Sequence, residues 1–352
     1  MRFAFGAGGT GGHIVPAIAL ADELQARGHY VVFLGNRDSM EERLAKAAEY
    51  PFFPIRVQKL YRSLKPHNLL FPYYLCLSIN QSKNILRTQK IDGVITTGGF
   101  VAGPVALASI LLKIPCFLHE SNSYPGLTTR HLRKRLSRLY ISFDESLAHL
   151  SGADTRNLGI PIKAKLKQDF ALEEIGLSSG KKTLLVTGGS QGSLAINTVI
   201  SGCVPALLDE GWQIIWQTGK SSYSKFVKIH NNMAGLHIFD FSSKLESMMY
   251  ASDLAITRAG AMTIAELEAS RTPAILIPLP SSAGNHQYYN ALAQEKKGIA
   301  QLVLQKDMSP EKIMQRIRTI DLESMHNRLA GIAPNRAAQD IVTDILDCIK
   351  ER

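Results

Sequence analysis

Short apolar runs alternate with amphipathic stretches along the whole chain. Runs rich in β-branched and aromatic residues predict strands in the first half at 2–5, 30–34, 93–96, 116–119 and 139–141. The second half repeats the pattern, with strands expected at 183–187, 213–217, 237–239, 254–257 and 274–278. Between the strands, apolar residues recur every three or four positions and predict helices at 14–27, 102–112, 194–208, 262–270, 287–297 and 337–349.

This alternation indicates parallel sheets covered by helices, and its repetition indicates two such domains. A length of 352 residues, of which 45% are hydrophobic, is enough for two cores. The segment 151–163, with Gly159 and Pro161, is the expected division. We expect one domain at 1–157 plus about 337–352, because the last helix can return to it, and a second at 158–336.

Charge and cysteine usage narrow the class of protein. A net charge of +10 favours an anionic partner, which leaves nucleic acid, an acidic membrane or a phosphorylated substrate. The four cysteines form no CxxC pair, which argues against a disulfide framework and a zinc site and favours a reducing cytoplasm. The first residues lack a signal-peptide pattern, and the apolar stretches are shorter than the roughly 18–20 residues that span a bilayer.

Three glycine clusters each follow an expected strand and open a helix: Gly8–Gly12, Gly98-Gly99 and Gly188–Gly192. Free backbone N–H groups and the positive helix end at such junctions attract phosphate. The first cluster also contains Gly6-x-Gly8-x-x-Gly11, the spacing of a dinucleotide fingerprint. The second strand ends in Leu34-Gly35-Asn36 without the acidic residue that would hold a ribose, so this spacing is weak evidence for a nicotinamide cofactor.

Two polar segments of the first half are candidates for chemistry. His13 follows the first glycine cluster and is either a turn residue or phosphate ligand, or a general base, since neutral imidazole accepts a hydroxyl proton. Glu120 and Asn122 follow the strand at 116–119, where they could bind sugar hydroxyls. The alternative for this segment is a cap for a helix expected at 125–138.

The second half carries three polar features at strand ends. Ser190 adds a hydroxyl to the third glycine cluster, a combination suited to a diphosphate. Glu266 lies one turn into the next helix and could bind a ribose diol, or pair with Thr263 in a capping box. The amides and imidazole of 285–290 suit neutral sugar hydroxyls.

Two surface segments concern the partner. The apolar stretch 69–79 is flanked by basic residues, and 130–135 is itself strongly basic. Such segments describe either a peripheral contact with anionic lipid or a core helix beside a solvated basic face. Nucleic acid is a weak rival, because no zinc knuckle, aromatic RNA-binding motif or helix-turn-helix spacing accompanies the charge.

Together these loops resemble the MurG family of bacterial N-acetylglucosaminyltransferases over essentially the whole chain. The specific segments are GGTGGHIVP at 8–16, TGGFVAGP at 97–104, 119–122 with 125–129, TGGSQGSLAIN at 187–197, 258–266 and 286–290. The resemblance implies the GT-B architecture, with two Rossmann-like domains around a cleft, and neither metal nor cofactor. It implies an inverting hexosyltransferase that moves GlcNAc from UDP-GlcNAc to the MurNAc C4 hydroxyl of lipid I, giving lipid II and UDP for the cell wall.

The resemblance also implies roles for single residues. For the donor these are Thr10, Gly11, Gly12, Asn122, Lys163, Gly189, Ser190, Gln191, Ser242, Ala261, Met262, Thr263, Glu266, Gln287 and Asn290. The acceptor diphosphate would meet Gly9, Thr10, Gly11, Gly12, Gly98, Gly99 and Phe100. His13 is the candidate base, with Glu120 as the alternative. The membrane contact would comprise Leu70, Phe71, Tyr74, Arg130, Arg133, Lys134 and Arg135, at the cytoplasmic face of the inner membrane.

Two departures and two rival functions stay open. Many relatives have arginine where this chain has Lys163, which keeps the charge and loses the bidentate fork. Some relatives pair two glutamines where this chain has His286-Gln287, so the role of His286 is undecided. A UDP-sugar epimerase on the same scaffold and a non-catalytic UDP-sugar-binding partner of other cell-wall enzymes are the alternatives to a transferase.

Overall fold

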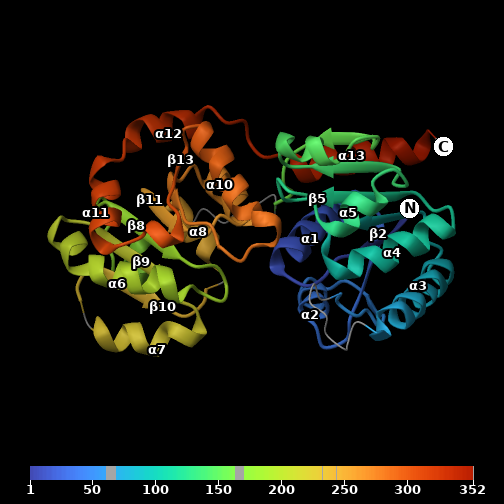
Figure 1. Cartoon of the computed structure of the whole chain (residues 1–352), viewed down its shortest axis with the longest axis horizontal. Coiled ribbons are helices and arrows are strands. Elements are labelled where there is room, and N and C mark those ends of the chain that lie inside the picture. Colours follow the sequence, from blue (N-terminus) through green and yellow to red (C-terminus); the bar gives the residue numbers. More distant parts are fainter. Residues whose placement is uncertain (61–68, 163–169, 232, 243, 352) are drawn as a thin grey trace. The chain divides into compact units, whose positions relative to one another are not determined.

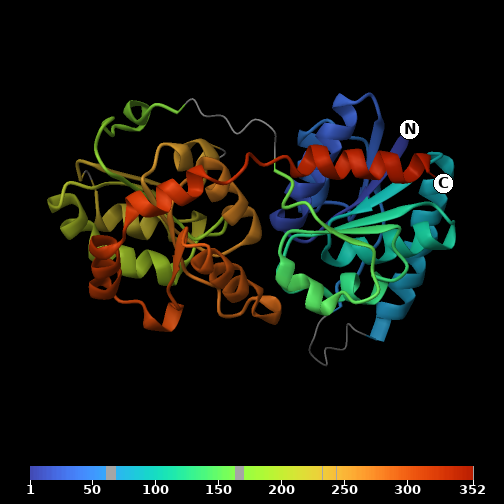
Figure 2. The same cartoon turned by 90° about the horizontal axis from the view of Figure 1, so that it is seen from above.

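The computed structural model describes residues 1–60, 69–162, 170–231, 233–242 and 244–351, which fold into two compact units. The first unit comprises Met1–Ala164 and Asn335–Arg352, and the second comprises Lys165–Pro334. Each unit contains a parallel sheet covered by helices (Figures 1 and 2). The α/β class and the pair of Rossmann-like sheets expected from the sequence are confirmed.

In the described part of the first unit, a seven-stranded parallel sheet has the order β3-β2-β1-β4-β5-β6-β7. Its strands are β1 (Arg2–Gly6), β2 (Tyr30–Gly35), β3 (Phe52–Pro54), β4 (Gly93–Thr96), β5 (Cys116–Glu120), β6 (Arg138–Ile141) and β7 (Thr155–Asn157). Phe3 and Phe5 join one apolar cluster and Ala4 joins another, because successive side chains of a strand point to opposite faces. Both faces are therefore buried, which explains why β1 is apolar after Arg2.

Helices cover both faces of this sheet. The cluster around Phe3 and Phe5 also contains apolar side chains of α1 (Gly11–Ala26) and α13 (Ala337–Lys350). The cluster around Ala4 contains side chains of α3 (Phe71–Thr88) and α4 (Gly99–Leu111). Shorter elements described in this unit are α2 (Met40–Ala47), α5 (Leu127–Leu132) and the 3-10 helix η2 (Asp144–His149).

Several elements of the first unit differ from the sequence expectation. The strands β3 and β7 were not expected, since each has three residues, too few for a hydrophobic period. The helix expected at 125–138 was wrong in length, because α5 covers Leu127–Leu132 alone. Arg138 already pairs with Phe117 of β5, so residues 133–137 must form the connection to β6.

In the second unit, the described residues form a six-stranded parallel sheet with the order β10-β9-β8-β11-β12-β13. Its strands are β8 (Thr183–Thr187), β9 (Gln213–Gln217), β10 (Leu236–Phe239), β11 (Leu254–Thr257), β12 (Ala274–Leu276) and β13 (Ala300–Leu302). Leu184 and Val186 of β8 face one apolar cluster, and Leu185 faces another. The described helices are α6 (Leu194–Asp209), α7 (Lys220–Ile229), α8 (Leu245–Tyr250), α9 (Ala261–Ser270), α10 (His286–Lys296), α11 (Pro310–Thr319) and α12 (Leu322–Ala330), with 3-10 helices η3 (Leu172–Ile175), η4 (Ala283–Asn285) and η5 (Gln305–Asp307).

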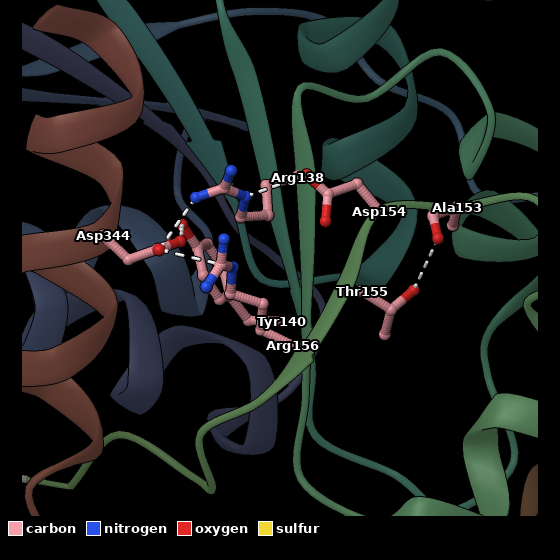
Figure 3. Close-up of polar contacts among 7 residues, drawn as sticks. All are labelled: Arg138, Tyr140, Ala153, Asp154, Thr155, Arg156 and Asp344. Carbon is pink, nitrogen blue, oxygen red and sulfur yellow. Dashed lines mark hydrogen bonds and ion pairs between the residues drawn. The ribbon is translucent and has the colours of Figure 1, made fainter. Parts of the chain in front are cut away.

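The last helix, α13, is attached to the first unit by a partly buried polar cluster (Figure 3). The Asp344 carboxylate accepts hydrogen bonds from the Tyr140 hydroxyl (2.8 Å) and from Arg138 Nη1 (2.8 Å), and Arg156 Nε lies 3.3 Å from it. Arg138 Nε also donates to Asp154 (3.0 Å). Burial first, and then the bond to Asp344, raise the pKa of Tyr140 far above its usual range, so its hydroxyl stays a donor.

We expect Asp344→Ala to lower the free energy of unfolding of the first unit by about 2–4 kcal/mol, because the buried Tyr140 hydroxyl and the partly buried Arg138 lose their shared acceptor. Asp347→Ala, which removes an exposed partner of Lys350 on the same helix, should change it by less than about 0.5 kcal/mol. Urea denaturation followed by circular dichroism measures both variants. Equal effects of the two substitutions would contradict the assignment.

Candidate active site

Parallel strands bring the candidate loops to one edge of each sheet. In the first unit, β1, β4 and β5 are neighbours, and their carboxyl ends lead into Gly8–Gly12, Gly98-Gly99 and Glu120–Asn122. In the second unit, β8, β11 and β12 are neighbours, and they lead into Gly188–Gly192, the start of α9 and the segment before α10. Ligands of open parallel sheets bind at this edge.

The first two glycine clusters pack directly on each other. Gly9, Gly98 and Gly99 have φ of +99°, +95° and +77°, a region that side chains disfavour. A Cβ at Gly99 would collide with the carbonyl oxygen of Gly8, and one at Gly9 would lie 3.2 Å from the ring of Phe100. The two loops therefore form one surface, with the exposed Thr10 as the N-cap residue of α1.

His13 lies in the first turn of α1, half-buried under the second glycine loop. Its Nδ1 is 2.9 Å from the carbonyl oxygen of Thr97, and the Thr97 hydroxyl donates to the carbonyl oxygen of His13 (2.6 Å). A carbonyl oxygen only accepts, so Nδ1 carries the proton of the neutral ring and Nε2 holds the lone pair. This tautomer is the one that a general base acting through Nε2 needs.

The Glu120 carboxylate is buried and organises the loop after β5. Within the described residues it accepts four hydrogen bonds, from the backbone and side-chain nitrogens of Asn122 (3.2 Å each), from Gly126 N (2.8 Å) and from Thr129 Oγ1 (2.7 Å). Glu120 thus fixes both Asn122 and the start of α5. The two hydrogen bonds from Gly126 and Thr129 favour the alternative in which Glu120 caps the helix that follows.

The third glycine cluster is preformed by close backbone contacts. A Cβ at Gly192, where φ is +75°, would collide with the carbonyl oxygen of Thr218, and one at Gly188 would collide with Ser193 N. Gly192 N donates to the carbonyl oxygen of Gly189 (2.9 Å), and Gly189 N donates to Thr187 Oγ1 (3.1 Å). Ser190 and Gln191 are exposed at the tip of this loop.

Residues at the end of β9 and just after it support this loop, and the sequence pattern did not single them out. Gln217 Nε2 donates to Thr187 Oγ1 (3.1 Å) and to the Gly189 carbonyl oxygen (3.2 Å), and Gln217 Oε1 accepts from Ser242 N (3.3 Å). Gly219 packs against Gln191 with φ of +80°. A glycine two residues after an expected strand is the signal that could have drawn attention to Gly219.

Glu266 lies on α9 beside a second carboxylate. The helix begins at Ala261 with Gly260 as N-cap, so Thr263 lies inside the helix and the capping-box alternative is wrong. Burial, followed by the negative charge of Glu246 on α8, raises the pKa of Glu266 to about 8. Met262 and Thr263 lie in the first turn of the same helix and are partly buried.

Gln287 and Asn290 lie three residues apart on the first turn of α10. Gln287 Oε1 accepts the backbone N–H of Leu279 (2.9 Å), which ties α10 to the loop after β12. Asn290 is buried and its Nδ2 donates to the Ala259 carbonyl oxygen (3.2 Å), next to the start of α9. Lys163, the remaining donor candidate, lies outside the described residues.

The candidate membrane residues of the first unit differ in exposure. At the start of α3, Leu69, Leu70 and Tyr73 are 83%, 56% and 63% exposed, whereas Phe71 and Tyr74 are partly buried. In the basic segment, Arg130 Nη1 donates to the Tyr124 hydroxyl (3.2 Å) and Arg133 Nε donates to the Ser151 carbonyl oxygen (3.1 Å). Lys134 and Arg135 are exposed.

No helix in the described part of the chain combines the length and apolar character needed to cross a bilayer. The described residues also contain no group of three or more His, Cys, Asp or Glu side chains arranged to hold a metal ion.

Comparison with known proteins identifies the family. Residues 3–141 match the model of the glycosyltransferase family 28 N-terminal domain, and residues 183–345 match that of the family 28 C-terminal domain. The chain belongs to glycosyltransferase family 28. The two matches correspond to the two sheets, with β1 to β6 in the first and β8 to β13 in the second.

Family 28 relatives match nearly the full length. The chain is 34% identical over 365 residues to the UDP-N-acetylglucosamine–N-acetylmuramyl-(pentapeptide) pyrophosphoryl-undecaprenol N-acetylglucosamine transferase of Desulfitobacterium hafniense, covering 99% of both. It is 33% identical over 352 residues to the protein of that name from Gloeobacter violaceus, covering 99% of this chain and 98% of the relative. The crystal structure of Acinetobacter baumannii MurG is 27% identical, with a TM-score of 0.77, and the match covers 100% and 99% of the two chains. The resemblance to the MurG family and the GT-B fold are confirmed.

The raised pKa of Glu266 gives this family 28 member a pH-dependent stability. A carboxyl group whose pKa rises from 4.5 when unfolded to about 8 when folded destabilises the folded second unit as it ionises. We therefore expect the free energy of unfolding to fall as pH rises from about 5 to 8 and Glu266→Gln to reduce that slope. Denaturant titrations at several pH values measure it.

The control for this slope is Glu268→Gln, on the same helix. Glu268 forms a surface ion pair with Lys297 (2.9 Å), so its removal should leave the slope between pH 5 and 8 unchanged. Glu246→Gln should reduce the slope in part, because it removes the second cause of the shift. An undiminished slope in Glu266→Gln would show that another group titrates.

Proposed function

We propose that this protein transfers GlcNAc from UDP-GlcNAc to the C4 hydroxyl of the MurNAc unit of lipid I, with inversion at C1, giving lipid II and UDP. The observation that carries the proposal is the match of 99% of the chain to relatives named for this transfer. The preformed glycine loops at the carboxyl edges of both sheets support it, because both substrates contain a diphosphate.

The donor half of the reaction belongs to the second unit. The loop Gly188–Gly192, with Ser190 and Gln191, binds the diphosphate through backbone N–H groups and the positive end of α6. The Glu266 carboxyl binds the ribose, with Ala261, Met262 and Thr263 beside it. Ser242 contributes backbone groups to the uracil site. Gln287 and Asn290 bind the GlcNAc hydroxyls.

The acceptor half belongs to the first unit. The joined surface of Gly9–Gly12 and Gly98–Phe100 binds the diphosphate of lipid I, since these loops form the N-terminal ends of α1 and α4, where backbone N–H groups and the positive helix end attract phosphate. His13 Nε2 takes the proton of the C4 hydroxyl as that oxygen attacks C1. The bond from C1 to the diphosphate oxygen breaks, and UDP leaves with the electron pair. Glu120, with both oxygens engaged, positions Asn122 instead of acting as base.

Incubation with UDP-GlcNAc and a soluble lipid I analogue tests the function. We expect a disaccharide product and one UDP released per disaccharide. An epimerase would change UDP-GlcNAc without needing the acceptor, and a binding protein would leave both compounds intact. Either result would refute the transferase.

The same assay tests the base. His13→Ala should lower kcat by about 10²–10⁴-fold with a much smaller change in KM for UDP-GlcNAc, because general-base catalysis acts in the transition state. The control is His326→Ala on α12, where Nδ1 bonds to the Leu322 carbonyl oxygen (2.8 Å) within its own helix. Near-normal kcat in His13→Ala would remove His13 as the base.

The acceptor carries a lipid, and we propose that the start of α3 contacts the cytoplasmic face of the inner membrane peripherally. Leu69, Leu70 and Tyr73 supply exposed apolar surface there. The basic residues of α5 and the residues after it, above all the exposed Lys134 and Arg135, face anionic headgroups. Phe71 and Tyr74 pack partly inward and support the contact.

Leu70→Glu should weaken binding to vesicles containing anionic lipid about fivefold or more, and added salt should weaken binding of the unchanged protein. The matched control is Leu111→Glu at the C-terminal end of α4, away from the start of α3. Leu70 and Leu111 are both 56% exposed. Vesicle sedimentation measures all three proteins. Binding that ignores salt, or equal losses in the two variants, would contradict the assigned surface.

A further inference from the structure

Arg258 is a partly buried cation directly beneath the third glycine loop. Arg258 is the first residue after β11 and lies two residues before Gly260, the N-cap of α9. Its Nη2 donates to Ser193 Oγ (2.7 Å) and to Gln305 Oε1 (2.6 Å). Its Nη1 donates to the carbonyl oxygens of Ile277 (3.2 Å) and Pro278 (3.1 Å), at the end of β12.

The charge of Arg258 has no counterion among its described contacts. All of these hydrogen bonds end on neutral oxygens, and none of the ion pairs in the described part of the chain includes Arg258. Burial accordingly lowers the pKa of Arg258 from its usual value. A buried charge without a partner is costly, and a hydrophobic or amide side chain could join the same elements at lower cost. A use for the charge itself would explain why a guanidinium is there.

Ser193 connects this charge to the loop. Ser193 directly follows the loop and is the N-cap of α6, and its hydroxyl accepts from Arg258 and also from Ile196 N (3.4 Å). The backbone nitrogen of Ser193 packs against Gly188, the first residue of the same loop. Through Ser193, the guanidinium therefore reaches both ends of the loop without lying in it.

We propose that Arg258 is a positioning residue that fixes the third glycine loop and supplies the positive charge under the donor diphosphate. The inference rests on the proposed function, in which this loop binds UDP-GlcNAc. The cation does not contact the diphosphate. Its charge favours a dianionic or trianionic nucleotide over a neutral nucleoside, and favours UDP most, since the departing group gains charge as the sugar leaves.

The test compares binding of UDP, UMP and uridine by isothermal titration calorimetry in the full chain. If Arg258 supplies a fixed charge under the diphosphate, Arg258→Gln should lower the ratio of the uridine Kd to the UDP Kd at least about tenfold. The ratio of the uridine Kd to the UMP Kd should fall by less. Arg258→Lys keeps the charge and should retain the preference within about threefold, even if all three ligands bind more weakly. If Arg258→Gln fails to fold, Arg258→Lys carries the test with the same expectation.

The control is Arg271→Gln, an exposed cation at the other end of α9. It removes the same net charge from the same unit and should leave the preference unchanged. Equal weakening of UDP and uridine in Arg258→Gln, or loss of the preference in Arg258→Lys, would overturn the electrostatic role and leave a structural one. A wild-type protein that binds UDP no better than uridine would refute the proposed function of the loop, and the inference with it.

Discussion

Both candidate sites depend on close contacts between backbone segments that follow the ends of neighbouring strands. In the first unit Gly99 lies on the Gly8 carbonyl oxygen, and in the second Gly192 lies on that of Thr218. No residue with a Cβ fits either place, and both have positive φ. The loops are therefore shaped by backbone packing before any side chain is considered.

Much of this arrangement could be predicted from the sequence. The long β-branched runs gave strands such as β4 and β8 with their observed bounds, since these strands are buried on both faces. Parallel pairing then brought the glycine clusters, His13 and Glu266 to the carboxyl edges of their sheets. Three-residue strands such as β13 escaped prediction because so few residues show no period.

The parts that could not be predicted involve polar side chains whose partners are distant in sequence. Glu120 was expected to bind sugar, to cap a helix or to be the alternative base, and its bond from Thr129 of α5 forms because the loop after β5 folds back on it. Arg258 was noted as the start of a motif, yet its partners Ser193 and Gln305 come from other strand ends. Spacing along the chain carries no information on such contacts, because the sheet order decides them.

The return of the last helix has a consequence for synthesis of the protein. Ile341, Val342 and Ile345 of α13 are fully buried in the core that also contains Phe3 and Phe5. During translation the first unit emerges long before these residues do, so its sheet must wait with one apolar face incompletely covered while the whole second unit is made. The first unit is thus the earlier to be synthesised and the later to be completed, and a chain that stops before α13 leaves an aggregation-prone surface.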